Sequence, residues 1–118
     1  MNNEIEVKKE FYDNGKLLSE FHIKNGKQEG LKTEWYESGE KKYEVLWKNG
    51  EEEGMETSWY ESSEKMYQIP WKNGEKEGLE TYWYESGLKR HETRWKKWLQ
   101  EGLETKWYEN GGKQHEKT

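Results

Sequence analysis

Apolar and polar positions alternate along most of the chain, and the same alternation returns every 24 residues. The unit from Leu31 to Gly54 returns from Met55 to Gly78 and from Leu79 to Gly102, with a looser copy before it and a partial copy after it. Alternation with period two predicts half-buried β-strands, and no stretch has the period of a helix. A fixed repeat of about 20–50 residues predicts an array in which each unit packs mainly on its neighbours.

Two turn signals separate the predicted strands in each copy. The first is Glu37-Ser38-Gly39 and the second is Asn49-Gly50, with equivalents in the other copies. Glycine can take the positive φ that tight hairpin turns need, so both signals predict hairpins. We expect an all-β fold, an elongated single-layer antiparallel meander of stacked hairpins. Its ten strands are expected near residues 4–12, 17–24, 31–36, 41–48, 55–60, 65–72, 79–84, 89–96, 103–108 and 113–117.

Loop lengths decide which side chains share a face of this sheet. We expect three-residue loops at both turns, with Gly39 left-handed in the first. Such loops pair Trp35 with Lys41 and Thr33 with Tyr43. Because 24 is even, odd-numbered residues then form one apolar face throughout, and even-numbered residues form a charged face.

The tryptophans fall into two series on the expected apolar face. We expect them to be structural and to line the edges of an aliphatic trough, although a groove for a peptide, an acyl chain or a sugar is the alternative. One series lies beside the first turn and the other beside the second: Trp35, Trp59, Trp83 and Trp107, then Trp47, Trp71 and Trp95.

A sheet with one apolar face must bury that face. It can curl into a half-pipe, pair with a second copy, or be covered by a partner. We expect curling, with a weak homodimer as an addition because the edge strands are open to pairing. The glycine that ends each copy, such as Gly54, indicates either a kinked strand or a turn residue with positive φ.

Composition is consistent with one folded repeat array over residues 1–118. Only 29% of the residues are hydrophobic and 38% are charged, which alone would favour disorder. Eight Trp and eight Tyr argue for a fold, since each large ring buries about 150–250 Å². The expected repeats span residues 7–30, 31–54, 55–78 and 79–102, with a partial copy at 103–118.

Charge and composition exclude several classes of function. The net charge is −5 and no basic block occurs, so nucleic-acid binding is not expected. Cysteine is absent, which removes disulfides and thiolate chemistry. The sequence opens without a signal-peptide pattern, so we expect a cytoplasmic protein, although removal of a leader would leave the same sequence.

No catalytic constellation, metal site or cofactor motif is expected. His91 and His115 lie one period apart, about 9–10 Å on alternate strands, which is too far to share a metal ion. The acidic run from Glu51 to Glu53 lacks the spacing of a calcium loop and predicts a solvated turn. Nucleophile elbows and phosphate loops are also missing from the sequence. We therefore expect a protein that is not an enzyme.

The candidate interaction surface contains a tyrosine ladder and one irregular turn. The tyrosines stand on the expected charged face beside the first turns, where they either contact a partner or cover lysine stems. The fourth copy reads Trp95-Lys96-Lys97-Trp98-Leu99 where Asn-Gly is expected, which leaves Trp98 and Leu99 exposed as either a contact patch or a neutral change. The complete set is Tyr12, Tyr36, Tyr60, Tyr84, Tyr108, Trp98 and Leu99.

Two other irregularities lie near the middle of the chain. Ser62-Ser63 stands where the other first turns end in glycine. Pro70 lies within an expected strand and lacks a backbone donor, which predicts a bulge or a missing ladder bond.

The repeated motif W-Y-E-x-G-x-K-x-x-E-x-x-W-K-N-G-x-x-E-G resembles MORN repeats, most closely the bacterial variant class. Glu20, Glu44, Glu92 and Glu116 occupy the glutamate of that motif, and Gln68 departs from it. The resemblance implies a non-catalytic scaffold of stacked hairpins that binds a protein. It also implies an antitoxin-like role with a toxin as the partner. Binding of phospholipid headgroups is the alternative, although an acidic chain is poorly suited to anionic membranes.

Overall fold

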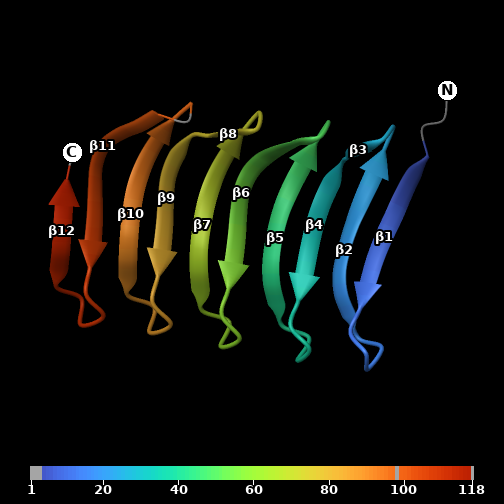
Figure 1. Ribbon diagram of the computed structural model, residues 1–118, viewed down its shortest axis with the longest axis horizontal. Helices are drawn as coiled ribbons and strands as arrows, with labels where there is room; N and C mark the ends of the chain where they lie inside the picture. Colours follow the sequence, from blue (N-terminus) through green and yellow to red (C-terminus); the bar gives the residue numbers. More distant parts are fainter. Residues whose placement is uncertain (1–3, 98, 118) are drawn as a thin grey trace.

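The computed structural model describes residues 4–97 and 99–117, which form one open antiparallel sheet without a helix (Figure 1). Ten strands follow one another in the order β1-β2-β4-β5-β6-β7-β9-β10-β11-β12, while the short β3 and β8 pair with β2 and β7. The predicted all-β meander is therefore confirmed. The strands are β1 Ile5–Phe11, β2 Leu17–Lys24, β3 Lys27–Gln28, β4 Gly30–Trp35, β5 Lys41–Lys48, β6 Glu51–Trp59, β7 Lys65–Lys72, β8 Glu75–Lys76, β9 Gly78–Trp83, β10 Lys89–Lys96, β11 Leu99–Trp107 and β12 Lys113–Lys117.

The sheet is long and thin. Its extents are 52 × 36 × 14 Å, and the two ends of the chain lie at opposite ends of the long axis (Figure 1). The small third dimension shows that the sheet is a single layer that does not close on itself. No helix that could cross a membrane occurs in the part of the chain that the structure describes.

The first turn of each copy has the predicted length. The loop Glu37-Ser38-Gly39 is closed by a hydrogen bond from Tyr36 N to Glu40 O of 2.9 Å, and Gly39 has a φ of 96°. Ser63 takes the place of this glycine in the third copy and also has a positive φ, 75°. Its side chain donates a 3.1 Å hydrogen bond to Glu40 Oε2, which fixes a serine in a conformation that usually favours glycine.

The second turn is shorter than predicted. Lys48 pairs directly with Glu51, so the loop is Asn49-Gly50 alone, with φ of 50° and 81°. Positive φ at both central residues gives a turn whose twist matches that of the strands. The predicted three-residue loop is therefore wrong. Lys97, which stands in the asparagine position of the irregular fourth copy, also has a positive φ of 48°.

A β-bulge follows the first turn of every copy and changes the register. Trp35 pairs with Lys41 as predicted, but the next pair is Glu34 with Tyr43, which leaves Lys42 as an extra residue. Thr33 consequently pairs with Glu44, and the predicted Thr33–Tyr43 pair is wrong. Because a one-residue shift moves side chains to the other face, the odd-even division of the whole chain is also wrong.

The sheet therefore has two mixed faces. We call them the tyrosine face and the threonine face. Tyr43 shares the tyrosine face with its partners Glu34 on β4 and Ser58 on β6. The two tryptophan series lie on opposite faces rather than along one trough. The tyrosine face carries Tyr43, Tyr67, Tyr82, His91, Trp47, Trp71 and Trp95, and the threonine face carries Thr33, Thr57, Thr81, Thr105, Trp35, Trp59, Trp83 and Trp107.

Burial is divided between the two faces. Val45 and Ile69 are the buried hydrophobic residues of the described chain, with exposures of 0% and 8%, and both lie on the tyrosine face. On the threonine face the four threonines of the repeat are all buried. Among the described residues, buried polar side chains outnumber buried apolar ones. The sheet is therefore stabilised by a partly polar layer of side chains on each face and not by one hydrophobic core.

The glycine at the end of each copy combines the two expected roles. Gly54 has a φ of 83° and lies within β6, where the pairing with β5 jumps by two residues. Strands β6 and β11 bend toward this end of the sheet (Figure 1). The strand is therefore kinked at a residue with positive φ.

Pro70 lies beside Gly78, the glycine that ends the third copy, but it does not cause the break in the ladder there. The ladder between β7 and β9 ends at Gln68–Thr81, but the ladder between β2 and β4 ends at the equivalent pair Glu20–Thr33 without a proline. A Cβ on Gly78 would lie 3.2 Å from the Pro70 ring. Pro70 thus occupies a break that the repeat already contains, and a side chain at Gly78 would have to displace the Pro70 ring.

Candidate functional site

The tyrosine ladder connects successive hairpins. Each hydroxyl donates a hydrogen bond to the backbone oxygen of the tryptophan 23 residues later, in the next copy. Tyr108 is at the end of the series and is 52% exposed. The hydroxyls before it are engaged within the fold, which leaves ring faces for any partner. The bonds are Tyr12–Trp35 at 2.5 Å, Tyr36–Trp59 at 2.6 Å, and Tyr60–Trp83 and Tyr84–Trp107 at 2.7 Å.

Cations cover two rings of the ladder. Lys42 Nζ lies 5.7 Å from the centre of the Tyr36 ring, and Arg90 Cζ lies 5.9 Å from that of Tyr84. Both cations are the extra residues of their bulges, which place them on the tyrosine face beside the ladder. The expected contact between ladder rings and neighbouring cationic side chains is therefore present at these two positions.

The irregular fourth turn is described only in part. Leu99 begins β11, pairs with Lys96 and is 71% exposed. Trp98, the other predicted member of this patch, lies outside the described residues. The structure therefore places one exposed apolar side chain at this corner of the sheet.

Lysines separate the tryptophans of the threonine face. Lys65 Nζ lies 5.9 Å from the centre of the Trp83 ring, and Lys89 Nζ lies 5.8 Å from that of Trp107. A hollow of about 310 Å³ between Trp59 and Trp83 is lined by Lys65. Cation–π pairs of this kind contribute about 0.5–1 kcal/mol each at exposed sites. The series is therefore an alternating row of rings and cations, not a continuous apolar groove.

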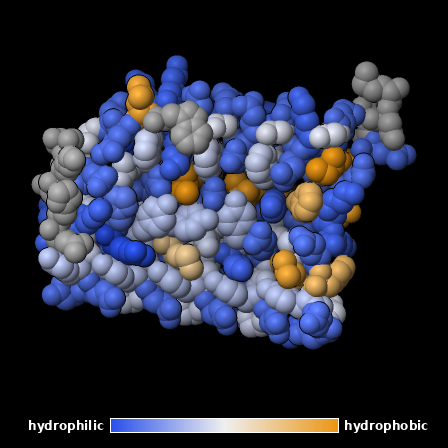
Figure 2. Space-filling model, in the orientation of Figure 1, coloured by the Kyte–Doolittle hydropathy of each residue, from blue (hydrophilic) through white to orange (hydrophobic). Residues whose placement is uncertain are grey.

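The centre of the tyrosine face is a row of stacked rings. The Tyr67 and Tyr82 ring centres are 5.4 Å apart, and those of Tyr82 and His91 are 5.8 Å apart with an angle of 22° between planes. Figure 2 shows pale side chains of intermediate hydropathy gathered over the central strands. This row extends across β7, β9 and β10.

Buried carboxylates hold the hydroxyl groups of this row. Glu56 accepts hydrogen bonds from Tyr67 Oη at 3.0 Å and Trp71 Nε1 at 2.8 Å. Glu80 accepts hydrogen bonds from Tyr82 Oη at 2.8 Å and Lys76 Nζ at 2.9 Å. Two strong partners for each carboxylate offset the desolvation of its charge.

This environment suppresses ionisation of the tyrosines. Burial raises the pKa of Tyr82 to about 12, and its hydrogen bond to Glu80 acts in the same direction. Burial, followed by the charge of Glu56, raises the pKa of Tyr43 and Tyr67 far above the usual value. The three hydroxyls are therefore protonated donors at neutral pH and cannot act as bases.

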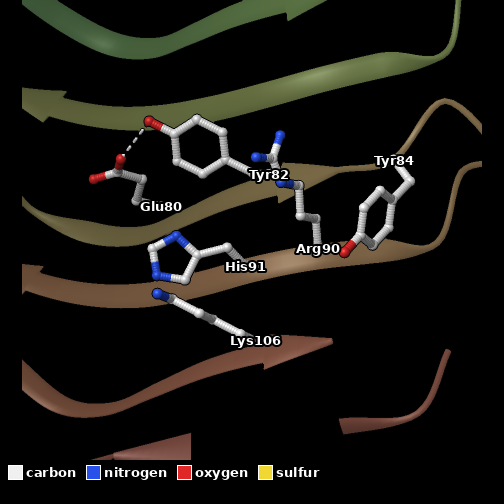
Figure 3. Close-up of a pocket in the computed structure, with 6 residues that line it drawn as sticks. All are labelled: Glu80, Tyr82, Tyr84, Arg90, His91 and Lys106. Atoms are coloured by element: carbon white, nitrogen blue, oxygen red, sulfur yellow. Dashed lines mark hydrogen bonds between the residues drawn. The ribbon is translucent and has the colours of Figure 1, made fainter. Parts of the chain in front are cut away.

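A hollow of about 450 Å³ lies at the C-terminal end of this face, over β9, β10 and β11 (Figure 3). Sequence reasoning missed it because the predicted register placed Arg90 and His91 on opposite faces. The bulge in β10 brings them to the same face, and Lys106 on β11 pairs with His91. The lining residues are Glu80, Tyr82, Tyr84, Arg90, His91 and Lys106.

The described residues contain no group of three or more His, Asp or Glu side chains that could hold a metal ion. His91 Nε2 lies 3.0 Å from Thr93 Oγ1 and 3.8 Å from Glu104 Oε2. His115 lies on β12, and its backbone pairs with Lys106. The hydroxyls of Tyr82 and Tyr84 are engaged within the fold, so the donors in the hollow that suit binding are the arginine and lysine side chains.

The family model of the MORN repeat variant matches residues 7–25 and 28–49, which cover most of the first two hairpins. No curated protein and no solved structure matches the chain. The MORN repeat is a non-catalytic motif that generally occurs in protein- or membrane-interaction modules. The matched segments are therefore similar to the MORN repeat variant, and the same 24-residue period continues beyond them.

Proposed function

We propose that this chain is a non-catalytic cytoplasmic scaffold that binds a protein partner across the tyrosine face. The observation that carries the proposal is a division between constant and changing positions among the repeats. Positions that hold the fold, such as Tyr36, Trp35 and Thr33, keep the same residue in every later copy. A central position of the tyrosine face changes in nearly every copy, in the order Glu10, Glu34, Ser58, Tyr82 and Lys106.

Changing side chains on a constant frame give each strand pair a different contact group. The fold does not require the changes, because the hydrogen bonds of the ladder and the turns are the same in each copy. The sheet measures 52 by 36 Å, enough for the roughly 800 Å² per partner of a stable protein interface. The tyrosine face therefore has both the variety and the size that a specific protein partner needs.

An antitoxin role, in which the bound protein is a toxin, is the more specific form of this proposal. It is supported by the resemblance of the motif to bacterial MORN variants. Binding of phospholipid headgroups is less favoured, because the chain has a net charge of −5 and anionic membranes attract basic clusters.

Affinity capture from the source cells tests the proposal with a matched pair of variants. Lys42→Glu reverses a charge on the tyrosine face, and Lys41→Glu makes the same change on the threonine face one residue away. We expect a protein that is retained by the unmodified chain and by Lys41→Glu but is several-fold depleted with Lys42→Glu. Equal retention by both variants would exclude the tyrosine face as the binding surface. Binding to vesicles that grows with their anionic lipid fraction would favour the headgroup alternative.

A further inference from the structure

The hollow at the C-terminal end of the tyrosine face brings two cations together. Arg90 is the extra residue of the β10 bulge, so it lies on the same face as its neighbour His91. Lys106 is opposite His91 on β11, and its side chain runs alongside the His91 ring (Figure 3). Neighbouring strands are about 4.8 Å apart, and both cations line the same hollow, Arg90 beside Tyr84 and Lys106 beside His91 (Figure 3).

Neither cation has a carboxylate partner among the described residues. The contact of Arg90 is with the ring of Tyr84, and Lys106 forms no ion pair in the part of the chain that the structure describes. By contrast, Lys41, Lys76 and Lys89 each have a carboxylate oxygen within 2.9 Å. Among the described side chains these two positive charges are uncompensated, and in a chain of net charge −5 they form a local site for an anion.

The carboxylate that lines the hollow does not neutralise them. Glu80 is 5% exposed, and its oxygens are engaged by Lys76 and Tyr82. Its charge is therefore balanced by Lys76 at 2.9 Å. The hollow keeps a positive surplus from Arg90 and Lys106.

The geometry suits a carboxylate on a carbon stem. A guanidinium presents two parallel donors that match the two oxygens of a carboxylate. The Tyr84 ring supports the guanidinium of Arg90, and Lys106 adds a point charge from the next strand. The stacked rings of Tyr82 and His91 line the same hollow and offer apolar surface to the methylene groups of an acidic side chain.

The charge of the tyrosine face changes from negative to positive along the sheet, and this change favours one orientation of a bound segment. The changing position runs from Glu10 and Glu34 near the N-terminal edge to Lys106 near the C-terminal edge. A segment that lies along the face is best matched when its acidic end meets β10 and β11. The same position is occupied by Ser58 and Tyr82 in the middle of the sheet, where no charge preference arises.

We propose that Arg90 and Lys106 bind a glutamate or aspartate carboxylate of an acidic peptide segment in this hollow. The inference rests on the proposed function as a protein-binding scaffold and adds the chemistry and location of one contact. It assigns the acidic end of the partner to the C-terminal end of the sheet.

Nuclear magnetic resonance titration with a defined probe tests this proposal. The probe is acetylated and amidated tetraglutamate, and the matched neutral peptide is tetraglutamine. We expect tetraglutamate to shift the backbone amides of His91 and Lys106, and tetraglutamine to leave them unchanged. The double variant Arg90→Gln with Lys106→Gln should bind the probe about tenfold more weakly or worse, because it loses the charge-assisted hydrogen bonds.

Arg94→Gln with Lys96→Gln is the matched control, because it removes the same charge from exposed residues of the opposite face. We expect this control to bind tetraglutamate as the unmodified chain does, with equal thermal stability in all three proteins. An equal loss in the control, or equal shifts with tetraglutamine, would overturn the proposal. Arg90→Lys keeps the charge but loses the paired donors, so it should bind with intermediate affinity.

Two further arms separate this site from other possibilities. Vesicles with anionic lipid that bind through Arg90 and Lys106, without any binding of tetraglutamate, would overturn the carboxylate assignment in favour of a phosphate site. A protein partner that still binds the Arg90→Gln, Lys106→Gln variant as tightly as the unmodified chain would overturn the inference while leaving the proposed function intact. Loss of that partner from the double variant and not from the control supports both.

Discussion

The tyrosines of the tyrosine face are stabilised by carboxylates instead of by apolar neighbours. Tyr67 and Tyr82 donate hydrogen bonds to Glu56 and Glu80, and both acceptors are among the most buried residues of the sheet. A buried carboxylate without donors costs several kcal/mol, whereas one with two donors is tolerated. This pairing explains how a chain with only 29% hydrophobic residues keeps buried positions on this face.

Alkaline pH should weaken the fold through these tyrosines. Tyr82 has a pKa of about 12 in the folded chain against an ordinary value of 10.0. A raised folded-state pKa gives stability that is complete below the unfolded value and is lost as the pH rises through the folded value. We expect the free energy of unfolding to be constant near neutral pH and to fall from about pH 10 upward, as measured by urea denaturation at each pH.

The variant Tyr82→Phe is the control for this pH effect. It removes one of the four tyrosine hydroxyls whose pKa is raised, so the decrease in stability above pH 10 should become smaller. Absorbance of the tyrosinate ion supplies an independent measurement, because the tyrosines of the row should ionise above the ordinary value of 10.0. Ionisation of all eight tyrosines in one step at the ordinary value would contradict the prediction.

Hairpins in this sheet are joined by a contact that recurs with the repeat. The hydroxyl of each ladder tyrosine crosses to the backbone of the next hairpin, so the link does not depend on the side chain of its acceptor. The repeat therefore requires a tyrosine at the ladder position, whereas the side chains around it can differ between copies. This explains why Tyr36 and its equivalents are identical in every copy, including the irregular ones.

Removing one of these hydroxyls should destabilise the whole array. Tyr60→Phe deletes the 2.7 Å bond to Trp83 O and leaves the ring in place. We expect a loss of about 1 kcal/mol in the free energy of unfolding, the usual net value of one hydrogen bond, measured by chemical denaturation. Tyr108→Phe is the control, because no described residue accepts a bond from its hydroxyl, and it should change stability by much less. Equal losses in the two variants would show that the ladder bonds do not join the hairpins.

The sequence predicted the strands and most turn positions but not the faces. Strand order follows from the regular turn signals, and the first turn was predicted with its left-handed Gly39. The faces failed because Asn49-Gly50 forms a loop one residue shorter than expected and because Lys42 is bulged out of the ladder. A bulge leaves no clear signal in the hydrophobic pattern, and one extra residue reverses every later side chain. The hollow at Arg90 was missed for the same reason.

Both ends of the open sheet are edges. Every residue of β1 is exposed, among them Ile5 at 55%, Val7 at 51% and Phe11 at 57%. One side of β1 pairs with β2, and the other side presents free backbone groups that can pair with a second chain. An exposed edge with apolar side chains favours association of the array through its N-terminal strand.

A charged residue on this edge should reduce self-association. We expect the unmodified chain to form weak dimers at high concentration in sedimentation equilibrium, and Val7→Lys to remain monomeric because a lysine on an edge strand disfavours pairing. Leu99→Lys introduces the same charge at an exposed position away from β1 and should leave the dimer unchanged. A monomeric unmodified chain at every concentration, or the same association in both variants, would contradict this prediction.

The opposed positions of the two chain ends give the sheet the properties of a molecular ruler (Figure 1). Each additional 24-residue copy adds two strands and lengthens the array by about 10 Å, without changing the contacts at either end. A partner held at the C-terminal hollow would therefore stand at a distance from the N-terminal edge that depends on the number of repeats. Gain or loss of one copy would change that distance by a fixed step. The number of repeats encoded in the gene would therefore set the distance between the bound partner and the N-terminal edge.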